Sequence, residues 1–172
     1  MKVLAETEAL KRLREFKKQF QETVRDEYEP RAKPCSACDT PGACCLDQHF
    51  VNVRITRLEA KTIAGFLDTL PEATRDGIER RIDKTIEAFH LDDENAGYYA
   101  CPLYEPGTGC LVHDAGKPLP CIHHACYEKK EDLPPEEMLL EGERSIDSLN
   151  RQTYGRQQTF LPLPVAIRKA SI

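Results

Sequence analysis

The chain has 172 residues, of which 40% are apolar and 31% are charged, proportions typical of a globular domain. Its formal net charge of −5 leaves no basic surplus to neutralise phosphates, which argues against a sequence-independent nucleic-acid binder. The first residues become charged too early for a secretory signal, and no apolar run approaches the roughly 20 residues that cross a bilayer. We therefore expect a cytoplasmic protein that binds neither nucleic acid nor membrane.

Apolar residues at helical spacing predict an amphipathic helix in the N-terminal segment, residues 1–30. The stripe consists of Leu10, Leu13, Phe16, Phe20 and Val24. Pro30 and Pro34 then end the helix. We expect the stripe to pack on its own domain, and the alternative is a helix that binds a partner protein.

A cysteine-cluster domain is predicted to follow over residues 31–155. Alternating residues over 50–56 indicate a short half-buried strand. Thr56 and Glu59 have the spacing of a capping box, which predicts that a helix starts immediately after the threonine and runs to about Thr69.

Two further helices and a long irregular segment complete this domain. Pro71 opens a helix that runs to about Leu91. Glycines and prolines then interrupt periodicity as far as a proline pair, after which a last helix continues to about Tyr154. Within the irregular segment, we expect a short helix that starts near Pro120 and holds Cys121 and the next cysteine along the chain.

The C-terminal residues 156–172 are apolar but interrupted by proline, which predicts an extended arm. We expect this arm to pack on its own domain or to reach a neighbouring chain. The predicted fold class is mainly α: a small helical domain around an irregular, loop-rich cysteine metal centre, with at most one or two short strands.

Eight cysteines form two clusters, with none between them. They are Cys35, Cys38, Cys44 and Cys45 in the first cluster and Cys101, Cys110, Cys121 and Cys126 in the second. In the cytosol thiols stay reduced and act as soft metal ligands rather than disulfide partners. We therefore predict that all eight are metal ligands, and that the metal is zinc or iron, the latter including a [4Fe–4S] cluster.

The spacing leaves the number of metal sites open. Two intervening residues let the sulfurs of Cys35 and Cys38 face one ion. Cys44 and Cys45 would point in opposite directions in an extended chain, so either only one is a ligand or the two serve adjacent metals. Eight thiolates suffice for two tetrahedral zinc sites, or for one four-iron cluster with four thiols to spare.

Some residues in or near the clusters have an alternative assignment. Cys45 and Cys126 are the candidates for small buried apolar residues without a ligand role. His113, His123 and His124 lie inside the second cluster, where we expect them beside the metal or a substrate rather than bound to the ion.

Several short motifs occur in a characteristic order. They are Cys35-Ser-Ala-Cys38, Cys44-Cys45, Thr56-Arg-Leu-Glu59, Cys101-Pro-Leu, Gly109-Cys110-Leu-Val-His, Lys117-Pro-Leu-Pro-Cys121 and Cys126-Tyr. In this order they resemble the YkgJ-like cysteine-cluster family, described as a zinc- or iron-chelating domain marked by eight cysteines. The match covers about residues 35–127. The family commonly has arginine where Lys117 stands and tyrosine near the position of His113, but neither difference removes a thiol.

Three functions follow as hypotheses. The first is a metal-binding module in which cysteines of both clusters converge. The resemblance extends to larger flagellin lysine methylases, whose cysteine domain is thought to carry an iron–sulfur cluster, so the second is an iron–sulfur redox or methyl-transfer accessory enzyme. The third is a thiol redox sensor. The chain contains no GxSxG, P-loop or HExxH motif, and its sequence does not decide whether it is an enzyme. A protein partner would bind through the N-terminal helix or the C-terminal arm.

Overall fold

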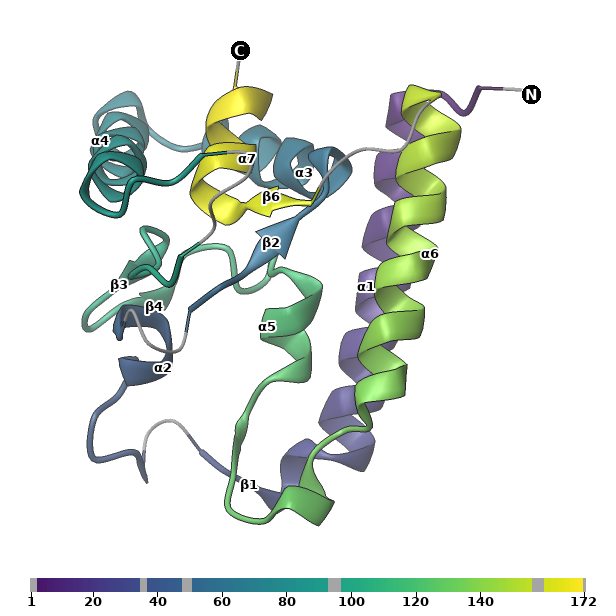
Figure 1. Ribbon diagram of the computed structural model, residues 1–172, viewed down its shortest axis with the longest axis vertical. Helices are drawn as coiled ribbons and strands as arrows, with labels where there is room; N and C mark the ends of the chain where they lie inside the picture. Colours follow the sequence, from purple (N-terminus) through teal and green to yellow (C-terminus); the bar gives the residue numbers. More distant parts are fainter. Residues whose placement is uncertain (1–2, 35–36, 48–50, 93–96, 156–159, 172) are drawn as a thin grey trace. The chain divides into compact units, whose positions relative to one another are not determined.

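A computed structural model of the chain describes residues 3–34, 37–47, 51–92, 97–155 and 160–171. These residues are mainly α-helical, which confirms the predicted fold class (Figure 1). The described α-helices are α1 (Glu6–Glu27), α2 (Ala43–Leu46), α3 (Arg57–Leu67), α4 (Glu72–Ala88), α5 (Leu119–His123), α6 (Glu136–Tyr154) and α7 (Leu163–Ala170).

The strands within the described ranges are six rather than one or two, but each has only two residues. They are β1 (Ala32–Lys33), β2 (Arg54–Ile55), β3 (Tyr104–Glu105), β4 (Gly109–Cys110), β5 (Cys126–Tyr127) and β6 (Leu161–Pro162). They form three antiparallel pairs, β1 with β5, β2 with β6 and β3 with β4. Two of these pairs join segments that are distant in the sequence.

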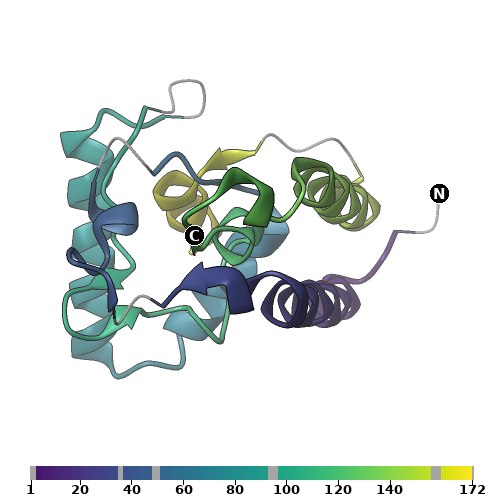
Figure 2. The ribbon, with the colours of Figure 1, turned by 90° about the horizontal axis from the view of Figure 1, so that it is seen from below.

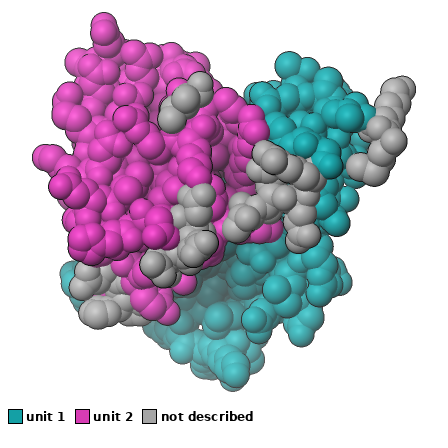
Figure 3. All heavy atoms as spheres, turned by 45° about the horizontal axis from the view of Figure 1, so that its top comes forward, with its two compact units in different colours: residues 1–41, 117–158 teal, residues 42–116, 159–172 magenta. Residues whose placement is uncertain are grey.

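The chain folds into two compact units, each assembled from two separate stretches (Figure 3). Unit 1 comprises Met1–Pro41 and Lys117–Gln158. Unit 2 comprises Gly42–Gly116 and Thr159–Ile172. This division differs from the predicted segments 1–30, 31–155 and 156–172, because the cysteine-bearing region contributes to both units.

Unit 1 is built on α1 and α6, which lie side by side and antiparallel (Figures 1 and 2). The backbone N–H of Leu4 donates to the carbonyl of Gln152 at 2.9 Å, and the Tyr154 hydroxyl donates to Glu6 at 2.8 Å. The N-terminal helix is confirmed, and its buried face lies inside this unit. No helix in the described part of the chain combines the length and apolar character needed to cross a membrane.

The short helix α5 packs against both α1 and α6. Gly142 makes this approach possible, because a Cβ at that position would lie 2.6 Å from Cδ2 of Leu119. The buried apolar side chains of unit 1 are Ala9, Leu13, Phe20, Val24, Leu119, Ile122 and Ile146.

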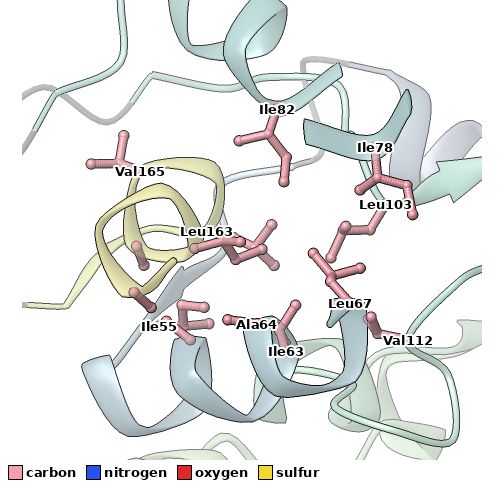
Figure 4. Close-up of a cluster of buried hydrophobic side chains, with 14 of the residues drawn as sticks. Ile55, Ile63, Ala64, Leu67, Ile78, Ile82, Leu103, Val112, Leu163 and Val165 are labelled. Carbon is pink, nitrogen blue, oxygen red and sulfur yellow. The ribbon is translucent and has the colours of Figure 1, made fainter. Parts of the chain in front are cut away.

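Unit 2 has an apolar core formed mainly by α3, α4 and α7 (Figure 4). Ile63 from α3, Ile82 from α4 and Leu163 from α7 are almost completely buried in it. The predicted capping box begins α3: the hydroxyl of Thr56 accepts from the backbone N–H of Glu59 at 3.3 Å, and the Glu59 carboxylate accepts from the N–H of Thr56 at 3.1 Å. Local sequence therefore determines where this helix starts.

The predicted extended C-terminal arm is wrong for the described residues, because most of them form α7. Pro164 lies in the first helical turn, where backbone N–H groups have no hydrogen-bond partner within the helix. The proline therefore removes no helical hydrogen bond and does not break the helix. The hydroxyl of Tyr99 donates to the carbonyl of Val53 at 2.6 Å and accepts from the N–H of Leu163 at 3.2 Å. The C-terminal segment is thereby joined to the core of unit 2.

Candidate metal centre

The division between the two units passes through both cysteine clusters. Unit 1 contains Cys35, Cys38, Cys121 and Cys126, and unit 2 contains Cys44, Cys45, Cys101 and Cys110. Cys35 lies outside the described residues, and the other seven cysteines are partly buried. Each unit therefore carries two cysteines from each cluster.

In unit 2, Gly42 places the first cluster against the β3–β4 hairpin. It is the N-cap of α2 and has a φ of +83°, a conformation that favours glycine. A Cβ on this residue would overlap the ring of Tyr104 in β3. The close approach of these two residues brings the helical turn with Cys44 and Cys45 next to the hairpin.

The helical conformation of α2 changes how Cys44 and Cys45 can act. The sequence suggested an extended chain, in which neighbouring side chains point to opposite sides. In a helix, successive side chains diverge by only about 100°. The geometric objection to both thiols serving one centre is therefore weaker than the sequence indicated.

Cys101 connects the second cluster to the first. Its backbone N–H donates to the carbonyl of Cys45 at 2.7 Å, although the two residues lie far apart in the sequence. Burial raises the pKa of the Cys101 thiol to about 11, and hydrogen bonds from the backbone N–H groups of Leu103 and Tyr104 act against this rise. These two amides are therefore placed to stabilise a thiolate at Cys101.

Cys110 lies on the second strand of the same hairpin. It is directly opposite Tyr104 in the β3–β4 pair, and the N–H of Leu111 donates to the carbonyl of Leu103 at 2.9 Å. Negative charge on Cys110 also raises the pKa of Cys101, so the two sulfurs are close enough to interact electrostatically. Cys110 therefore lies within electrostatic range of Cys101.

Arg81 supplies a positive charge beside this group. It extends from α4, its Nη1 lies 3.5 Å from Oε1 of Glu105, and its charge lowers the pKa of Cys101. Its Nε is buried without a hydrogen-bond partner in the described structure. Sequence reasoning missed Arg81, because an arginine in the middle of a charged helix carries no local sign of a nearby thiol.

In unit 1 the two clusters also approach each other. Cys126 lies in β5 directly opposite Lys33 of β1, which precedes the first cluster. Cys121 lies on α5, whereas Cys126 follows the helix, so the prediction that one short helix holds both is wrong. Sγ of Cys38 lies 4.0 Å from Oγ1 of Thr40.

The three histidines occupy different surroundings. The backbone N–H of His113 donates to the carbonyl of Cys110 at 3.1 Å, but its side chain is exposed. Nε2 of His123 lies 3.2 Å from the carbonyl oxygen of Pro135, and the side chain of His124 is exposed.

Thiolates are ligands for both zinc and iron, and unit 2 contains four cysteines, Cys44, Cys45, Cys101 and Cys110. Amides directed at one sulfur and a nearby arginine are also suited to a negatively charged thiolate centre. Among the described side chains, no group of three or more Cys, His, Asp or Glu stands in an arrangement that could hold an ion.

Comparison with known proteins found no matching family model, no matching curated protein and no matching solved structure. The resemblance to the YkgJ-like family therefore stays a prediction from the motifs.

Proposed function

We propose that the protein is a cytosolic metal-binding protein whose cysteine thiolates hold zinc or iron. The observation that best supports this proposal is the 2.7 Å hydrogen bond from the Cys101 N–H to the Cys45 carbonyl, which joins the two clusters. Reduced thiols that come together from distant parts of a chain are characteristic of metal centres in the cytosol.

The surroundings of Cys101 support a metal role more than an inert buried thiol. A thiol that is only a small apolar residue needs neither directed amides nor a positive charge. Cys101 has the amides of Leu103 and Tyr104 and the guanidinium of Arg81 nearby. Because a metal binds the thiolate, it would displace the proton that burial favours, and these groups would then stabilise the bound form.

The test is metal analysis of the full chain, purified without oxygen and with its thiols reduced. We expect bound zinc without visible colour, or bound iron with labile sulfide and a visible absorption that bleaches on reduction. Either result supports the proposal, and the colour distinguishes the two metals.

A matched control removes the thiols while keeping the size of the side chains. The variant with Cys44, Cys45, Cys101 and Cys110 all changed to serine should bind less metal than the wild-type chain. If reduced wild-type protein takes up neither zinc nor iron above the level of this variant, even when metal is supplied, the proposed function is wrong for unit 2.

A further inference from the structure

We propose that the groove between α1 and α6 in unit 1 is a docking site for an amphipathic helix of another protein, a helix that carries acidic side chains beside its apolar face. The groove has a volume of about 470 Å³, and all the residues that line it belong to unit 1. This inference does not depend on metal binding, so its test is separate from that of the proposed function.

Apolar side chains from both helices line the groove. Leu13 of α1 and Ile146 of α6 are almost completely buried, whereas Phe16 and Leu149 are only partly covered. The helix α5 packs against both α1 and α6, but none of its residues lines the groove. Apolar surface is therefore left open between the two helices, and covering it with a further apolar face is favourable.

The charge of the groove is opposite to that of the whole chain. Its lining includes the exposed Arg12 and Arg144, one from each helix, and no Asp or Glu, although the chain has a formal net charge of −5. Arg144 makes no hydrogen bond or ion pair with another described residue. Arg12 pairs with Glu8 at 2.8 Å, but both side chains are about half exposed, and such surface pairs contribute little to stability. Charge complementarity therefore favours a partner with carboxylates on both sides of its apolar face.

The open, elongated form of the groove suits a helix better than a small molecule. The lining on α6 runs from Arg144 to Gln152, about 12 Å along the helix axis, and apolar side chains at positions i, i+4 and i+7 of a docked helix span about 10 Å. Ser145 and Ser148 are short, which leaves room for such side chains. A small ligand needs a site that encloses most of its surface, and a nucleic acid needs many more cations than two arginines.

The experiment selects binders from a displayed library of random peptides of about 16 residues, which is about four helical turns. The target is the reduced full chain, and the counter-target is Ser145→Trp, which fills the groove without changing its charge. Selected peptides are synthesised with a fluorescent label, and anisotropy titrations give the Kd for each variant of the chain. Circular dichroism checks that every variant keeps the helical content of the wild-type chain.

We expect the peptides that distinguish the wild-type chain from Ser145→Trp to be acidic, with apolar residues at i, i+4 and i+7. Arg144→Glu should weaken their binding about 10-fold or more, because like charges would then face each other. Arg14 is exposed on α1 outside the groove, so Arg14→Glu, which changes the net charge equally, should alter the Kd less than about twofold. The proposal is overturned if no peptide makes the distinction, if those that do are neutral or basic, or if both charge reversals weaken binding equally.

A second measurement locates the bound peptide without any substitution in the chain. A selected peptide with a photoreactive group at one apolar position is cross-linked to the wild-type chain, and the modified residues are mapped by mass spectrometry. We expect labels on residues that line the groove, such as Phe16 and Leu149, and labels confined to unit 2 would contradict the proposal. Sedimentation of the chain alone tests a different occupant. A dimer that Ser145→Trp dissociates would show that a second copy fills the groove, which also overturns the proposal.

Discussion

Gly42 allows α2 to approach β3 closely, both because it adopts a left-handed backbone conformation and because it has no Cβ. Its φ is +83°, and a Cβ would overlap the Tyr104 ring. We expect Gly42→Ala to lower the free energy of unfolding by about 2–5 kcal/mol, because backbone strain and overpacking both contribute. Urea unfolding of the reduced chain measures this change.

Gly107 is the matched control for that substitution. Its φ is +82°, but no atom lies within 4 Å of where its Cβ would be. Gly107→Ala should therefore cost only the backbone strain, about 1–2 kcal/mol. If both variants lose the same free energy of unfolding, the Tyr104 contact places no constraint on the residue at position 42.

Arg81 offers a test of electrostatic support for a thiolate at Cys101. Arg81→Met removes the positive charge beside Cys101 and keeps much of the side-chain volume. If Cys101 is a ligand as proposed, we expect the metal affinity of the chain to fall about 10-fold or more, the usual effect of losing a group that supports a ligand. Competition with a chromophoric chelator measures the affinity. Arg80→Met on the exposed side of α4 is the control and should leave the affinity unchanged.

At the scale of elements, Tyr99 joins the C-terminal segment to β2. We expect Tyr99→Phe to lower the free energy of unfolding by about 1–2 kcal/mol, because the buried hydroxyl bonds to Val53 and Leu163 are lost. The neighbouring Tyr98, which is 54% exposed, provides the control Tyr98→Phe. Chemical denaturation of both variants should show a loss only for Tyr99→Phe; a comparable loss in Tyr98→Phe would contradict the assignment.

Elements with local signals were predictable from sequence, and those that depend on distant contacts were not. The Thr56–Glu59 capping box and Pro71 correctly indicated the starts of α3 and α4. The prolines of the C-terminal segment predict an extended chain, but Pro164 lies in the first turn of α7, where proline is compatible with a helix. The two-residue strands contain no periodicity, so their pairings could not be read from sequence.

The same distinction applies to the candidate centre. Residue type and clustering alone marked the eight cysteines as candidate ligands, because thiols are soft metal ligands. Which cysteines lie together in each unit depends on tertiary contacts such as Cys45 with Cys101 and Lys33 with Cys126. Cys38 and Cys44 are close in the sequence and belong to the same cluster, but Cys38 lies in unit 1 and Cys44 lies in unit 2.

At the scale of the whole molecule, metal binding should contribute directly to stability. A metal that binds only the folded state raises the free energy of unfolding, and a structural zinc site contributes of order 10 kcal/mol. We expect a strong chelator to lower the urea concentration at the unfolding midpoint of the metal-loaded protein. The circular dichroism signal of the helices measures this midpoint. Mg²⁺ is the control because it prefers oxygen ligands and should not restore stability. An unchanged midpoint after complete metal removal would contradict this expectation.

The discontinuous make-up of the units has a consequence for the way the protein is made on the ribosome. The helix α1 leaves the exit tunnel long before its neighbour α6 has been translated, and unit 2 waits for α7, which follows all its other elements. During that interval the nascent chain carries an uncovered apolar stripe together with reactive sulfurs. Chaperones and the reducing capacity of the cell would therefore matter most for this protein while its synthesis is still under way.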